Sequence, residues 1–60
     1  MKVGDLVEKI SGYDAGTVGI VTDISTNAAG NTLVHVLADG IMKVYGYSGL
    51  RVVDNFVNLL

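Results

Sequence analysis

The sequence predicts an all-β domain, a small five-stranded antiparallel barrel with a short apolar C-terminal tail. Its 60 residues suffice for one domain at most. Eight glycines and no proline divide the chain into short runs rich in Val, Ile, Thr and Tyr, which is typical of strands joined by turns. No apolar stripe at helical spacing continues for three turns.

The first two expected strands span residues 5–10 and 17–24, with a glycine-containing loop between them. In the second strand the apolar phase changes between Val21 and Ile24. An extra residue in one strand of a pair produces such a change, so we expect a β-bulge near Thr22 and Asp23.

The third and fourth strands are expected at 32–38 and 41–46, after a polar turn at 26–31. Asp39 and Gly40 separate them, and Asp-Gly between strands favours a two-residue type I′ turn because both residues need positive φ. A tight or 3₁₀ turn at 47–49 then leads to a fifth strand at 50–53. We assign residues 1–54 to the barrel and 55–60 to the tail, docked on the barrel or on a partner.

The Asp-Gly turn fixes the pairing of the central hairpin, and both of its faces are largely apolar. One face carries the pairs Ala38/Ile41, Val36/Lys43 and Val34/Tyr45, and the other carries Leu37/Met42, His35/Val44 and Leu33/Gly46. An antiparallel sheet needs only one apolar face, so the second must be covered by the tail or by another protein. We expect His35 to pack on the sheet rather than to act as a pH switch.

Charge and composition exclude several function classes. The net charge is −2, and four scattered cations make a poor basic stripe for nucleic acid. There is no cysteine and only one histidine, so a zinc site of the usual kind cannot be built. No phosphate-binding or nucleophile-elbow motif occurs, and we expect neither enzyme activity nor a cofactor. No stretch reaches the roughly 20 apolar residues that span a bilayer, so we expect no membrane partner.

The pattern resembles the SH3-like barrel, and its N-terminal half resembles a KOW-type motif. The resemblance is carried by Val3-Gly4-Asp5-Leu6-Val7, Gly12, Gly16, Gly19, Ile20-Val21 and Ile24, then by 34–40, Tyr45 and 50–53. The second half is similar to small SH3-like proteins of tailed bacteriophages. KOW domains usually surround the motif with Lys and Arg, whereas this chain places acids there. Peptide-binding SH3 domains use an aromatic groove with Trp, which this chain lacks.

From these patterns we expect a non-enzymatic interaction or structural module that buries an apolar face in an assembly, either with further copies of itself as a homo-oligomer or as part of a larger protein assembly. The resemblance implies a virion component or a binder of a host protein, located in the host cytoplasm or the virion, and the N-terminus does not read as a signal peptide. The predicted partner-binding residues are Tyr13, Val34, Val36, Lys43, Tyr45, Tyr47, Phe56, Leu59 and Leu60. The alternative is a KOW-like nucleic-acid-binding module that uses Lys2, Lys9, Lys43 and Arg51.

Overall fold

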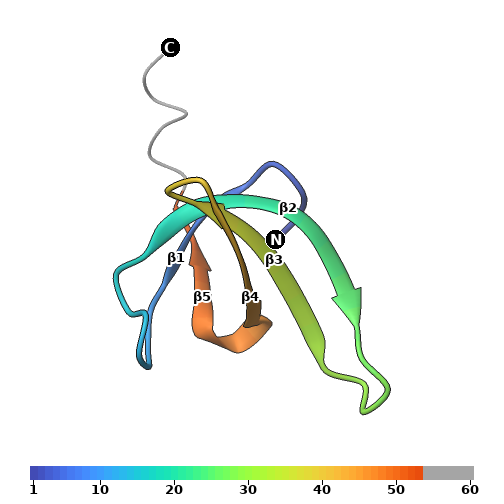
Figure 1. The fold of residues 1–60 in the computed structure, drawn as a ribbon. Helices are drawn as coiled ribbons and strands as arrows, with labels where there is room; N and C mark the ends of the chain where they lie inside the picture. Colours follow the sequence, from blue (N-terminus) through green and yellow to red (C-terminus); the bar gives the residue numbers. More distant parts are fainter. Residues whose placement is uncertain (54–60) are drawn as a thin grey trace.

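The computed structural model describes residues 1–53, which form a single strongly curved antiparallel sheet (Figure 1). The strands are β1 (Leu6–Lys9), β2 (Val18–Thr26), β3 (Thr32–Ala38), β4 (Ile41–Gly46) and β5 (Leu50–Val52), with a 3₁₀ turn, η1 (Tyr47–Gly49), before β5. All five predicted strands and the 3₁₀ turn are confirmed. The predicted tail, 55–60, and Asp54 lie outside the described residues.

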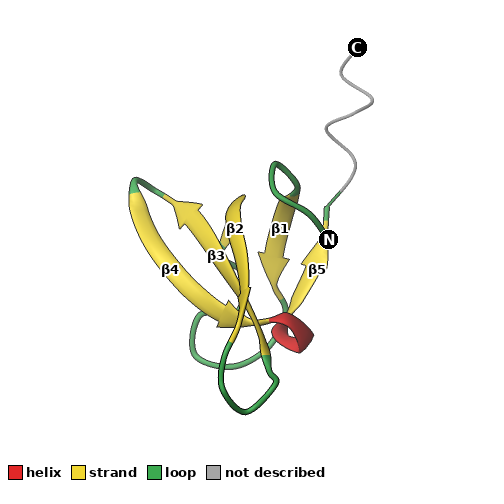
Figure 2. Ribbon diagram, turned by 90° about the vertical axis from the view of Figure 1, so that its right-hand side faces the viewer, coloured by secondary structure: helices red, strands yellow, loops and turns green. Residues whose placement is uncertain are grey.

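The strand order is β4-β3-β2-β1-β5, so β4 and β5 are the two edges and do not pair with each other. The all-β, five-stranded antiparallel class is therefore confirmed, but the sheet is open and a closed barrel is not observed. Figure 2 shows β3 and β4 on one side, β1 and β5 on the other, and η1 carrying the chain between the edge strands. Three residues of 3₁₀ turn bridge the two edges without a ladder of backbone hydrogen bonds.

The central hairpin has the predicted register from Ala38↔Ile41 to Leu33↔Gly46. Asp39 has φ 54° and Gly40 has φ 74°, as a type I′ turn requires. Asp tolerates this region better than most residues, and glycine adopts it without strain. The turn chemistry therefore sets which side chains share a face.

The predicted bulge lies at Thr22. Val21 pairs with Val36, but the next residue of β3, His35, pairs with Asp23, so Thr22 is the extra residue. Because the bulge adds one residue, odd-numbered side chains face inward before it and even-numbered ones after it. The hydroxyl of Thr22 donates a 3.3 Å hydrogen bond to the carbonyl oxygen of His35.

The core lies on the concave face of the sheet and consists of small and branched side chains. Its members are Val7, Val21, Val34, Val36 and Leu50, with Met1, Ile24 and Tyr45 packed against them. Gly19 lies on the same face opposite Val7, and a Cβ there would sit 2.5 Å from the carbonyl oxygen of Leu37. The absence of a side chain at Gly19 thus allows β2 to approach β3 closely where the sheet bends.

Candidate interaction face

The two faces of the β3–β4 hairpin have opposite environments. Val34 and Val36 are 0% and 1% exposed, so they belong to the core. The prediction that these two residues bind a partner is wrong, because the bend of the sheet turns their face toward β1 and β5. The outward face is the alternate one, which carries Leu37, Met42 and Val44.

Four apolar side chains form a continuous patch on the convex face, which we call the outer patch: Ile20, Leu37, Met42 and Val44. Ile20 pairs with Leu37 and Leu37 pairs with Met42, so these three form one row across β2, β3 and β4, and Val44 lies two residues from Met42 along β4. The four are 41%, 42%, 54% and 51% exposed, respectively. Side chains directly opposite each other are in contact distance on a sheet, so their exposed areas merge.

Polar groups border the outer patch on the side of the bulge. Nε2 of His35 lies 3.1 Å from Oγ of Ser25, and Asp23 is the cross-strand partner of His35. The Thr22 hydroxyl also lies 3.4 Å from the sulfur of Met42. The packing role predicted for His35 fits this half-buried position on β3, and the polar border limits the patch to the half of the sheet nearer the Asp39–Gly40 turn.

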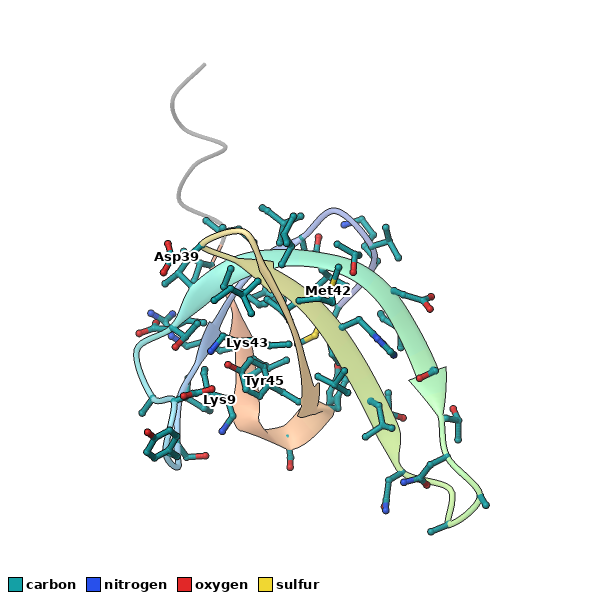
Figure 3. The ribbon with its side chains drawn as sticks, viewed as in Figure 1. Lys9, Asp39, Met42, Lys43 and Tyr45 are labelled. Atoms are coloured by element: carbon teal, nitrogen blue, oxygen red, sulfur yellow. The ribbon has the colours of Figure 1, made fainter. Side chains whose placement is uncertain are left out.

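A polar cluster joins the loop between β1 and β2 to the concave side of β4. The hydroxyl of Tyr45 donates a 2.7 Å hydrogen bond to Oδ2 of Asp14, and Nζ of Lys43 lies 3.4 Å from the same oxygen. Nζ of Lys9 lies 5.4 Å from the centre of the Tyr45 ring, a cation–π contact. Figure 3 shows Lys43 and Tyr45 pointing from β4 toward Lys9. Side chains thus span the gap that backbone hydrogen bonds leave open.

The ionisable groups of this polar cluster shift one another's pKa values. The Tyr45 hydroxyl and the Lys43 ammonium lower the pKa of Asp14, because both donate hydrogen bonds to its ionised form. The pKa of Lys43 is raised by the hydrogen bond to Asp14 and by its charge. Burial and the nearby Asp14 carboxylate raise the pKa of Tyr45. The cluster therefore holds its charged carboxylate and neutral phenol together over the ordinary pH range.

The predicted partner-binding residues do not form one surface. Lys43 and Tyr45 point into the concave side and engage Asp14. Tyr13 is fully exposed in the β1–β2 loop, and Tyr47 is about half exposed in η1. The other predicted partner-binding residues, Phe56, Leu59 and Leu60, lie outside the described residues, 1–53.

Three of the four cations are ion-paired within the chain. Lys2 contacts Asp5 at 3.0 Å, Lys43 contacts Asp14, and Nη2 of Arg51 lies 2.7 Å from Oε1 of Glu8. The fourth, Lys9, lies over the Tyr45 ring and donates to the carbonyl oxygen of Ser11. Neutralised cations release few counterions from a phosphate backbone, so this arrangement gives the nucleic-acid alternative little support.

The sequence reasoning missed Ile20, Leu37, Met42 and Val44 as site residues, although the register that groups three of them was predicted. Two features of the sequence indicate that the hairpin face with Leu37, Met42 and Val44 is the outward one. His35 lies on the same face as Leu37, and a polar ring is more easily accommodated toward solvent. The opposite face carries Val34, Val36 and Ala38, whose small size suits a tightly bent core.

Within residues 1–53, no group of three or more His, Asp or Glu side chains lies close enough together to hold a metal ion. No helix in the described part of the chain is long and apolar enough to cross a membrane. No family model matches the chain, and no curated protein or solved structure shows significant similarity to it.

Proposed function

We propose that this chain is a non-enzymatic protein-interaction module that buries its outer patch against a protein surface. The observation that carries the proposal is the row Ile20–Leu37–Met42 with Val44 beside it, four roughly half-exposed apolar side chains in direct register. Contiguous exposed apolar surface on a small domain commonly marks an interaction site. None of the four side chains is charged, so the patch favours an apolar partner surface over an ionic ligand.

The balance between buried and exposed apolar groups gives further support. The buried apolar side chains among the described residues are four valines, one alanine and one leucine. The exposed apolar side chains include larger residues such as Ile20, Ile41 and Met42. A domain of about 60 residues buries only about 60% of the surface that its unfolded chain exposes, and its stability is correspondingly marginal. Association through the outer patch would bury apolar area that the chain cannot cover with residues 1–53 alone.

A role in a bacteriophage assembly, as a virion component or a host-protein binder, is part of the proposal on a narrower basis. It depends on the sequence resemblance to small SH3-like phage proteins, whereas the interaction role depends on the outer patch. The two parts are therefore tested separately, and the experiment below addresses the interaction role.

Site-specific photo-crosslinking tests this function. A photoreactive amino acid replaces Met42 in the outer patch and, as the control, Tyr13, which is fully exposed in the β1–β2 loop. In the cell that makes the protein, we expect covalent protein adducts from position 42 and few from position 13. The substitution Leu37→Gln in the first variant should reduce those adducts severalfold. Equal adduct formation at both positions, or none at position 42, would contradict the proposal.

A further inference from the structure

The backbone of β4 has free hydrogen-bonding groups at the same residues that contribute to the outer patch. In a two-residue hairpin Ala38 and Ile41 exchange both hydrogen bonds, so Ile41, Lys43 and Tyr45 direct their N–H and C=O groups toward β3. The alternate residues, Met42, Val44 and Gly46, direct theirs away from the sheet, and β4 is an edge strand. Among the described residues, no segment outside η1 forms backbone hydrogen bonds with these three; the C=O of Gly46, the N-cap of η1, accepts the first hydrogen bond of that turn, which leaves its N–H free.

Such an edge is a template for another strand. Proteins commonly protect edges with charged residues, proline or bulges. β4 has no proline and no bulge, and its one charge, Lys43, points to the concave side and is paired with Asp14. The convex side of the edge presents Met42 and Val44, both about half exposed. Backbone and side chains therefore offer a partner strand contacts at the same place.

We propose that the partner strand is β4 of a second copy of this chain, paired antiparallel about a two-fold axis at Val44. This inference rests on the proposed function and names the occupant of one edge of its site. In this register Val44 pairs with Val44 of the second copy, and Met42 pairs with Gly46 of the second copy. The free backbone groups of Met42 and Val44 and the N–H of Gly46 all face partners, and Gly46 leaves room for the long side chain of Met42.

Charge complementarity favours this register over its neighbours. An axis at Lys43 would place two lysines directly opposite each other, which is destabilising. An axis at Met42 would move the pairing into the Asp39–Gly40 turn and lose one ladder pair. The axis at Val44 instead places Lys43 opposite Tyr45 of the second copy, whose hydroxyl is bonded to a carboxylate, Asp14. The two-fold symmetry repeats this pairing of Lys43 with Tyr45 on the other side of the axis.

The pairing joins two open sheets into one and brings the two outer patches onto the same convex face. Ladder hydrogen bonds and the packing of Val44 across the axis stabilise the pair. The contact along one strand is smaller than a standard protein interface, which takes about 800 Å² from each partner. We therefore expect a dimer that dissociates on dilution.

Sedimentation velocity over a wide concentration range tests the inference. The mass of the wild-type chain should rise from 6.3 kDa toward twice that value as concentration increases. Val44→Lys puts two charges at the axis and should weaken dimerisation at least tenfold, while its exposed position leaves the fold intact. Val18→Lys is the matched control, because Val18 is 47% exposed on the same face but lies on β2, and it should dimerise like wild type.

A cysteine at the axis reports the register directly. The chain has no cysteine, and residues opposite each other in a hydrogen-bonded antiparallel pair have Cα atoms about 5.5 Å apart, within the range that a disulfide spans. Val44→Cys should oxidise to a covalent dimer much faster than Val18→Cys. Equal oxidation rates, or a wild-type chain that stays monomeric at millimolar concentration, would overturn the inference. A crosslinked adduct from position 42 that contains a different protein and never a second copy would also overturn it, while leaving the interaction role supported.

Discussion

The hydroxyl of Tyr45 donates a 2.7 Å hydrogen bond to Oδ2 of Asp14, a residue 31 positions earlier in the chain. This bond ties the β1–β2 loop to an edge strand with which β1 has no ladder. Tyr45→Phe keeps the ring and its contact with Lys9 but removes the donor, so we expect faster proteolytic cleavage in the loop and a lower melting temperature. Tyr47→Phe is the control and should resemble wild type. Unchanged cleavage in Tyr45→Phe would show that the loop is held by other contacts.

Acid should weaken the fold through Asp14. Its pKa in the folded chain lies below the ordinary value of 3.8, because Tyr45 and Lys43 donate to the carboxylate. The stabilisation is therefore fully present above that ordinary value and is lost as the pH falls through the folded-state pKa. The free energy of unfolding, measured with urea between pH 2 and pH 6, should fall toward acid.

Asp14→Asn isolates this contribution. Asparagine has no carboxylate to protonate, so the variant should be less stable above pH 4 and should lose less stability on acidification. A smaller acid dependence should remain, because the hydrogen bonds from Lys2 also lower the pKa of Asp5. If the variant and the wild type lose the same amount of stability, Asp14 is not the responsible group.

Gly19→Ala should be strongly destabilising. The added Cβ would lie 2.5 Å from the carbonyl oxygen of Leu37 and 2.6 Å from Cγ1 of Val36, so the β2 and β3 backbones must separate. We expect a loss of about 1–3 kcal/mol in the free energy of unfolding, as for other overpacked sites. Gly46→Ala is the control, because a Cβ there meets nothing within 4 Å and its φ is −67°, and its effect should stay within about 0.5 kcal/mol.

The stability of variants at Asp39 should depend on how well the new residue tolerates a positive φ. Asp39 has φ 54°, so Asp39→Gly or Asp39→Asn should retain wild-type stability. A β-branched residue is strained in this region, and Asp39→Val should cost about 1–2 kcal/mol. Thermal unfolding of the three variants is the measurement. A Val variant as stable as the Asn variant would contradict a type I′ turn.

Much of the fold could be predicted because the decisive signals are local. Asp39 and Gly40 determine the turn, the turn determines the register, and the change of apolar phase around Thr22 locates the bulge. Strand ends were less accurate, since β2 continues to Thr26 where its pairing with β3 satisfies two further residues. Closure into a barrel depends on the twist accumulated over five strands, which no local pattern specifies.

The choice of Val34 and Val36 as partner-binding residues was wrong because the charge of Lys43, on the same face, opposes the local signals that place this face inward. Lys43 is the only charged residue of β4, and a charged residue suggests a solvent-facing side. Its charge is instead met by Asp14, 29 positions away, and its neighbour on the same face, Tyr45, finds a partner in the same carboxylate. This long-range pairing allowed the face with a lysine to become the concave one.

The bulge at Thr22 has a consequence for how mutations are tolerated along the chain. In a saturation mutagenesis library, polar substitutions in β2 should be depleted at the odd positions Gly19 and Val21 before the bulge and at the even position Ile24 after it. Deleting Thr22 would leave the remaining β2 residues opposite their present β3 partners, but it would remove the local kink of β2 and the hydrogen bond from Thr22 to the carbonyl oxygen of His35. The single inserted residue therefore sets the point at which the inward-facing positions of β2 change from odd to even numbers. Sequences related to this one should carry the inserted residue at the same distance from the hairpin turn.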